Sequence, residues 1–219
     1  MTSLNFTRTQ DMLANIATCD KCNLPKHGRH GSQVTIFPSR KNNTSVYCES
    51  RLEAAFCLEL ERNSKVLRYD AHPFTINFIG TKYRYTPDFL VRLANGEEQL
   101  IEIKNDYSYQ DKAITGRITR YIELLAEQDC ILEYLPAAKF YGKIRTPNLN
   151  YLYHGAYCSQ GTVGASIRTV LTQCAPDRRP MSCLTDNGFQ FEDIAHALFY
   201  KIIRCDIFKP LSLTSLTWI

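Results

Sequence analysis

Two acidic residues and a lysine that could act together on a phosphate group lie in one short stretch: Asp88, Glu102 and Lys104. Residues i and i+2 of a strand share a face, so a strand over 100–104 places Glu102 beside Lys104. Converging carboxylates repel each other unless a cation separates them. Mg²⁺, with Mn²⁺ as a substitute, suits this place because it prefers oxygen ligands and bridges carboxylates to phosphate. Lys104 would then orient or deprotonate a water molecule, or stabilise charge on the phosphate.

The connection between these residues predicts a β-hairpin. The apolar run 89–93 is followed by Ala94-Asn95-Gly96-Glu97 and then by 100–104. Asn-Gly between such segments favours a type I′ turn, in which both central residues have positive φ. Folding of the hairpin would bring Asp88 beside the Glu-x-Lys pair. The alternative is a surface hairpin with ordinary charges, because this motif alone is weak.

An amphipathic helix predicted over 48–62 supplies a further carboxylate. Its apolar residues recur at the spacing of one helical face: Leu52, Ala55, Phe56 and Leu60. We expect Glu53, at the margin of this face, to point inward, whereas Glu59 and Glu61 face solvent. Glu49 is the competing candidate. Either residue could instead be a solvated charge or a partner of the helix dipole.

The order of these elements matches the core of the PD-(D/E)xK nucleases, and residues 48–104 resemble the TnsA endonuclease family. Members are the nuclease subunits of heteromeric cut-and-paste DNA transposons. The residues that carry the resemblance are Glu49-Ser50-Arg51-Leu52-Glu53, Tyr85-Thr86-Pro87-Asp88-Phe89-Leu90-Val91 and Leu100-Ile101-Glu102-Ile103-Lys104. It covers about a quarter of the chain closely and the remainder only in outline.

The resemblance implies an activity, site residues and partners. Such a subunit cuts the 5′ strands at transposon ends in double-stranded DNA, while a TnsB-type transposase cuts and joins the 3′ ends and a TnsC-type ATPase regulates assembly. The implied catalytic residues are Glu53, Asp88, Glu102 and Lys104. The implied metal-binding residues are Glu53, Asp88, Glu102 and Ile103.

Three questions stay open at this stage. The family commonly has Gln where this chain has His72, so His72 is either a partly buried histidine bonded to the backbone or a catalytic residue. Another PD-(D/E)xK enzyme, for restriction or repair, is an alternative to the transposon nuclease. A non-catalytic DNA-binding assembly scaffold is the alternative outside enzymes.

A second metal pattern lies near the N-terminus. Structural Zn²⁺ is one interpretation, because all four residues are good zinc ligands: Cys19, Cys22, His27 and His30. The other interpretation is a basic loop near DNA, continued by Arg40 and Lys41.

The whole pattern predicts an α/β protein with a restriction-endonuclease-like core, a mixed sheet flanked by helices, and a small winged-helix-like C-terminal domain. We expect a basic arm over 1–45, a nuclease domain over 46–142 and a winged-helix-like or partner-docking domain over 143–219. Lys and Arg outnumber Asp and Glu by 6 to 2 in the arm and by 8 to 5 in the last segment, but number 12 against 15 in the core. Basic flanks around an acidic core fit carboxylates that hold metal and flanks that contact DNA phosphate.

Further elements follow from local patterns. A helix is expected over 109–128 and a strand over 130–135, closing the sheet. The stretch 142–150 has Pro147 and two asparagines, which indicates a domain boundary. Helices over 162–173 and 191–204 and a strand or hairpin over 207–219 are expected beyond it.

Composition narrows the class of protein. The sequence has no run of 18 apolar residues, so no membrane span or membrane partner is expected. The first 20 residues lack the continuous apolar stretch of a signal peptide. An odd total of nine cysteines favours reduced thiols over a disulfide framework. These features favour a cytoplasmic protein, and the resemblance implies a bacterial one associated with the nucleoid.

Overall fold

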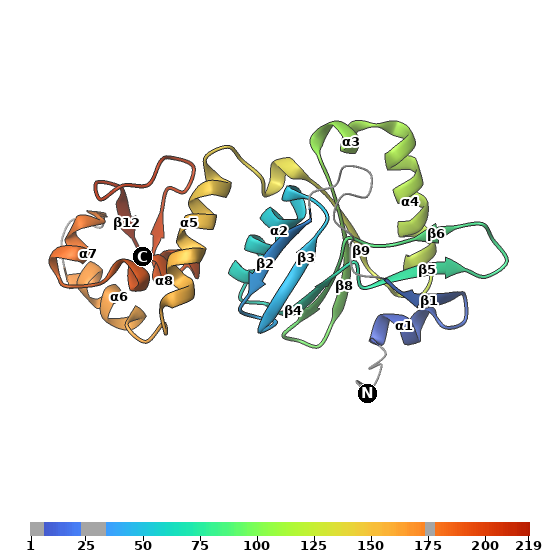
Figure 1. Cartoon of the computed structure of the whole chain (residues 1–219), viewed down its shortest axis with the longest axis horizontal. Coiled ribbons are helices and arrows are strands. Elements are labelled where there is room, and N and C mark those ends of the chain that lie inside the picture. The colour runs from blue at the N-terminus through green and yellow to red at the C-terminus, as the bar shows by residue number, and fades with distance from the viewer. Residues whose placement is uncertain (1–6, 23–33, 174–177) are drawn as a thin grey trace. The chain divides into compact units, whose positions relative to one another are not determined.

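The computed structural model describes residues 7–22, 34–173 and 178–219 (Figure 1). It contains helices and several sheets, which confirms the α/β class. The chain forms two compact units: unit 1 is Met1–Cys57 with Lys65–Lys139, and unit 2 is Leu58–Ser64 with Phe140–Ile219.

Unit 1 is built around a four-stranded sheet. In spatial order its strands are β4 (Val66–Ala71), β7 (Phe89–Leu93), β8 (Glu98–Lys104) and β9 (Leu132–Pro136). Neighbours are antiparallel except β8 and β9, which run parallel. A parallel pair needs a long crossover, and here it contains α3 (Asp106–Gln110) and α4 (Lys112–Ala126). The single helix expected over 109–128 is thus two, because the Asp111 side chain accepts from the N–H groups of Ala113 and Ile114 and starts α4.

The β7–β8 hairpin is confirmed, with Arg92 opposite Glu98, but the predicted turn type is wrong. Gly96 has a φ of 85°, whereas φ of Asn95 is not positive. The N–H of Leu93 donates to the Glu97 carbonyl (2.8 Å), and the N–H of Gly96 donates to the Leu93 carbonyl (2.9 Å). A loop that ends in a glycine bulge therefore replaces the type I′ turn.

Alternate residues of the sheet face two helical layers. The ring of Phe89 lies 5.3 Å from that of Phe56 on α2 (Arg51–Arg62). The next residue, Leu90, is buried in a cluster with Ile118 and Leu125 of α4. Because successive strand residues point to opposite faces, α2 and α4 cover opposite sides of the sheet (Figure 1). This arrangement withdraws both faces of β8 from water.

Segments of the predicted basic arm belong to the sheets of unit 1. Helix α1 (Arg8–Leu13) precedes β1 (Ala17–Lys21), which pairs with β5 (Phe74–Phe78); β6 (Arg84–Tyr85) lies on the other side of β5. A separate hairpin contains β2 (Thr35–Ser39) and β3 (Thr44–Cys48). Between them, the Asn42 amide donates to the Tyr69 carbonyl (2.7 Å) and accepts from the Tyr69 N–H (3.2 Å). Asn42 thereby fixes this hairpin against β4.

The described part of unit 2 combines the end of α2, four further helices and a small antiparallel sheet. The helices are α5 (Arg145–Cys158), α6 (Gly164–Gln173), α7 (Ser182–Asp186) and α8 (Phe191–Phe199). The strands are β10 (Arg179–Pro180), β11 (Arg204–Cys205) and the central β12 (Leu216–Trp218). Strand β12 confirms the expectation of a strand in the tail.

The stretch 142–150, expected to mark a domain boundary, is largely helix, because Pro147 falls in the first turn of α5, where a missing N–H costs nothing. The two compact units divide just before it, between Lys139 and Phe140. One expectation for this region is wrong. The helix expected to reach Arg204 ends at Phe199, since Lys201 has a φ of 60° and the Ile202 N–H turns back to the Ala197 carbonyl.

Among the described segments, no helix is long and apolar enough to cross a membrane. The eight cysteines that the structure describes are free thiols, including Cys48 and Cys57, whose sulfur atoms lie 3.7 Å apart in the interior.

Candidate active site

Asp88, Glu102 and Lys104 meet where β7 begins and β8 ends. Lys104 Nζ lies 2.5 Å from Glu102 Oε1 and 3.6 Å from Asp88 Oδ2. It also donates to the carbonyl of Ile103 (3.0 Å). The Lys104 side chain is 28% exposed, whereas those of Asp88 and Glu102 are 15% and 6% exposed. The hairpin therefore brings these residues together as expected, with the ammonium at the edge that water reaches.

Neighbouring strands fix the orientation of Asp88. Its Oδ2 accepts a hydrogen bond from the Ile103 N–H (2.8 Å). Its backbone carbonyl accepts from the His72 N–H (2.9 Å), one residue beyond the last ladder pair, Ala71 and Phe89. Asp88 is thus held by β8 through its side chain and by the end of β4 through its backbone.

Tyr85 of β6 holds Glu102 and is a residue whose role the sequence did not reveal. Its hydroxyl donates to Glu102 Oε2 (2.8 Å), inside the protein. The Tyr85 ring stacks on Tyr121 of α4 with centroids 4.5 Å apart, and the Tyr121 hydroxyl donates to the Arg84 carbonyl (3.0 Å). The bond to Tyr85 leaves Oε1 of Glu102 for Lys104.

The cluster has more buried negative charge than positive charge. Burial raises the pKa of Asp88, and the nearby Glu53 adds to the increase, against the opposing effects of Lys104 and the Ile103 N–H. Burial and the charge of Asp88 likewise raise the pKa of Glu102. Burial alone would lower the pKa of Lys104, but Asp88 and Glu102 outweigh it and raise that pKa. One ammonium therefore compensates two carboxylates incompletely, and an added cation would be attracted.

Glu53 points inward, as predicted, and caps its own helix. Oε2 accepts from the Glu49 N–H (2.7 Å) and Oε1 from the Ser50 hydroxyl (2.8 Å), while Ser50 Oγ accepts from the Glu53 N–H (3.1 Å). Glu53 is 7% exposed, and Glu49 is exposed. The expectation that Glu61 faces solvent is wrong, because Glu61 is 1% exposed and the last turn of α2 belongs to the interior of unit 2.

The structure joins Glu53 to the Asp88 cluster less directly than the resemblance implies. Two observations connect Glu53 to the cluster. Glu53 Oε2 lies 3.6 Å from His72 Nε2, and the charge of Glu53 raises the pKa of Asp88. Within the described ranges, no three His, Cys, Asp or Glu side chains are grouped closely enough to hold a metal ion.

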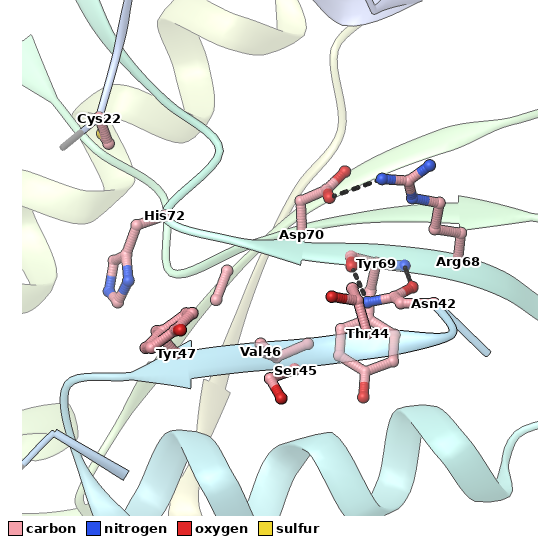
Figure 2. A pocket seen from close by; sticks show the side chains of 11 residues that line it. Cys22, Asn42, Thr44, Ser45, Val46, Tyr47, Arg68, Tyr69, Asp70 and His72 are labelled. Carbon is pink, nitrogen blue, oxygen red and sulfur yellow. Dashed lines mark hydrogen bonds and ion pairs between the residues drawn. The ribbon is translucent and has the colours of Figure 1, made fainter. Parts of the chain in front are cut away.

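A cavity of about 170 Å³ lies beside the site, between the β2–β3 hairpin and β4. Figure 2 shows His72 and Cys22 at one end and the Arg68–Asp70 ion pair (3.5 Å) near the other, with β3 along one side. His72 also lines a second cavity of about 480 Å³. His72 therefore borders space that solvent or a ligand can occupy and also approaches Glu53.

The N-terminal zinc pattern lies partly outside the described residues, because His27 and His30 are not among them. Cys19 belongs to β1, and the Cys22 sulfur lies 3.4 Å from Thr75 Oγ1. Burial, with the negative charge of Asp20, raises the pKa of Cys19 to about 11, so that residue is a neutral thiol here.

No protein-family model matches this sequence, and no curated protein matches it either.

If the cluster supports the metal-dependent strand cleavage that the resemblance implies, we expect Glu53→Gln to lower the cleavage rate by about 10²-fold or more, because the change removes the charge of a buried carboxylate that acts on Asp88. Loss of one cap acceptor should cost only about 1 kcal/mol of stability. The matched change Glu49→Gln alters an exposed carboxylate one turn earlier and should leave cleavage within about twofold. Cleavage rates and urea unfolding of both variants test this; the reverse order would assign the role to Glu49.

Proposed function

We propose that the protein is a Mg²⁺-dependent DNA endonuclease of the PD-(D/E)xK class that cuts the 5′ strands at transposon ends. In this proposal it acts with a TnsB-type transposase and a TnsC-type ATPase. The observation that carries the nuclease assignment is the packing of Asp88, Glu102 and Lys104 into one partly buried cluster. An ordinary surface hairpin would leave its carboxylates in water. Buried carboxylates with raised pKa values oppose stability and are typical of functional sites.

The donor set of the cluster fits Mg²⁺. Asp88 and Glu102 offer carboxylate oxygens, and Ile103, which lies between Glu102 and Lys104, offers its backbone carbonyl oxygen. All are hard ligands of the kind that Mg²⁺ prefers, and Glu53 would add a further carboxylate. When bound, the ion would stabilise charge on the phosphate and lower the pKa of a water molecule.

The remaining chemistry belongs to side chains of the chain itself. Lys104, at the exposed edge, would donate to the attacking water or to a phosphate oxygen as negative charge develops. Tyr85 keeps Glu102 oriented through its hydroxyl. The N–H of Ile103 keeps Asp88 oriented in the same way. Because these supports come from packed strands, the reacting groups are positioned before DNA arrives.

The surrounding architecture supports the finer proposal. A hairpin, a parallel partner strand and the crossover helix α4 form a mixed sheet flanked by helices. In unit 2, short helices and a three-stranded antiparallel sheet support a winged-helix-like domain. Exposed apolar side chains near its end, at Leu213, Leu216 and Ile219, suit contact with a partner protein.

We expect the protein alone to cut DNA weakly, and to cut the 5′ strands at transposon ends when the transposase holds them. Residues 46–140 have 12 basic against 15 acidic residues, so unaided affinity for DNA phosphate is low. A transposase that binds both this protein and the DNA ends should raise the rate of cleavage by about 10²-fold or more, because it raises the effective concentration of the DNA at the site.

The measurement is strand-specific cleavage of end-labelled DNA with Mg²⁺, with and without the transposase. A matched DNA with scrambled ends is the control. Efficient cutting of plain duplex by the protein alone would favour a restriction or repair enzyme. DNA binding and assembly without any cleavage would favour the scaffold.

A further inference from the structure

His72 is held in a backbone conformation that few residues adopt. Its φ is 45°, in the left-handed region, and Pro73 follows it, which restricts its backbone further. Its N–H donates to the Asp88 carbonyl at 2.9 Å, so the strained residue is fixed to the same backbone that presents the Asp88 carboxylate. Strain of this kind persists where the surroundings impose it, and it clusters at functional sites.

The hydrogen bonds of the fold do not explain the position of the His72 ring. Nε2 lies 3.6 Å from Glu53 Oε2, which is too long for a hydrogen bond. Nδ1 is buried and has no hydrogen-bond partner among the residues that the structure describes. Both side chains are largely buried, at 16% and 9% exposed. A buried nitrogen without a partner is unfavourable for stability, so no hydrogen bond from the described residues accounts for the place of the ring near Glu53.

The charges around the ring come from both sides of the site. Glu53 of α2 lies 3.6 Å from its Nε2, and both groups act on Asp88: the charge of Glu53 raises the pKa of Asp88, and His72 lowers it. Asp88 in turn contacts Lys104, which also contacts Glu102. The imidazole is therefore next to the helix carboxylate and within electrostatic reach of the cluster on the hairpin.

We propose that His72 is a positioning residue that draws the Glu53 carboxylate from its helix cap toward Asp88. This inference rests on the proposed nuclease function. In the structure both oxygens of Glu53 accept bonds from the start of α2, so a competing donor is needed to turn the carboxylate. Charge-assisted N–H···O bonds are about 2.7–2.9 Å long, so Nε2 must move by less than about 1 Å from its present distance. The backbone bond between His72 and Asp88 then links the placement of the two carboxylates.

Three variants distinguish the two properties that could matter at position 72: a side chain long enough to contact Glu53, and tolerance of the left-handed backbone conformation. The amide of Gln extends about as far as Nε2 of histidine, whereas the amide of Asn is one methylene shorter. Asn and Gly adopt the left-handed conformation more readily than Gln. If His72 serves the backbone, His72→Asn and His72→Gly should be the mild changes. If it serves Glu53, His72→Gln should be the mild change.

We expect His72→Gln to cleave DNA within about threefold of the parent, and His72→Asn and His72→Gly to cleave about 10–100-fold more slowly. The latter two should unfold at a urea concentration no lower than the parent. The Mg²⁺ concentration for half-maximal cleavage should rise about tenfold in both, because Glu53 is less well oriented. The assays use the full chain with its transposase and a titration of Mg²⁺.

The possible failures are distinguishable. If the parent shows no Mg²⁺-dependent cleavage that Asp88→Ala removes, the proposed function fails and the role of His72 fails with it. If the parent cleaves and His72→Asn or His72→Gly cleaves equally well, only the inference about His72 is overturned. Faster cleavage by His72→Asn than by His72→Gln would also overturn it, because it would show that His72 matters only for the backbone conformation.

Discussion

Replacing Asp88 with Asn should lower Mg²⁺-dependent DNA cleavage by about 10³-fold or more, because several kcal/mol of charge stabilisation at the phosphate depend on the metal. The substitution removes the charge of the carboxylate and keeps its shape. The amide oxygen can still accept from the Ile103 N–H, which is 2.8 Å from Oδ2 in the parent. The lost activity would therefore reflect lost metal binding and not a collapsed hairpin.

The matched control is Glu97→Gln, in the turn of the same hairpin. Glu97 is exposed and uses its backbone in the turn, donating to Asn95 and accepting from Leu93. The DNA cleavage rate of Glu97→Gln should stay within about twofold of the parent rate. Undiminished cleavage by Asp88→Asn in the same assay would remove Asp88 from the site.

The same variant should become more stable relative to the parent as pH rises. A free Asp has a pKa of about 3.9, and burial raises the pKa of Asp88 in the folded protein. Between these values the folded state binds more protons than the unfolded state, so the free energy of unfolding of the parent falls with increasing pH. Asp88→Asn lacks this decrease. Its stability relative to the parent should rise from about pH 4 through the folded pKa and then level off.

Urea unfolding from pH 4 to pH 8 without divalent cations measures this difference. The control at each pH is Glu97→Gln, whose exposed carboxylate should give a nearly constant difference. A relative stability of Asp88→Asn that falls as pH rises would show that the buried carboxylate is stabilised in its charged form.

The convergence of Asp88, Glu102 and Lys104 was predictable because every step is local. A two-residue period sets the face of β8, and an Asn-Gly pair indicates the hairpin. The turn type was wrong because the same dipeptide serves more than one loop, and its choice depends on which residue takes positive φ. The cap at Ser50 and Glu53 has the three-residue spacing of a capping box, so a local reading could have found it.

The contacts of Tyr85 and His72 at the site could not be predicted from the neighbouring sequence. Tyr85 reaches Glu102 only because β6 pairs with β5 and its ring stacks on α4. His72 reaches Glu53 only because β4 pairs with β7 and its own φ is positive. Neither non-local pairing leaves a pattern in the neighbouring sequence. Pro147 shows how position changes the meaning of a residue, since proline stops helices in their interior but is tolerated in the first turn of α5.

Lys104→Met should separate metal binding from catalysis. Lys104 Nζ contacts both carboxylates, at 2.5 Å and 3.6 Å, and so competes electrostatically with any cation they would hold. Removing its charge should tighten Mg²⁺ binding by about fivefold, which is about 1 kcal/mol, the interaction of two unit charges about 4 Å apart when water screens them fully. Cleavage should nevertheless fall by about 10²–10³-fold, the usual cost of losing one donor to the developing charge.

The two effects are measured by calorimetric titration with Mg²⁺ and by single-turnover cleavage at saturating Mg²⁺. Lys112→Met removes an exposed lysine of the same unit and should leave both quantities within about twofold. Lys104→Arg keeps the charge but replaces a compact ammonium with a planar fork, so it should bind Mg²⁺ like the parent and cleave more slowly. Weaker Mg²⁺ binding by Lys104→Met would show that the ammonium does not share these carboxylates with the metal, and unchanged cleavage would remove Lys104 from the reaction.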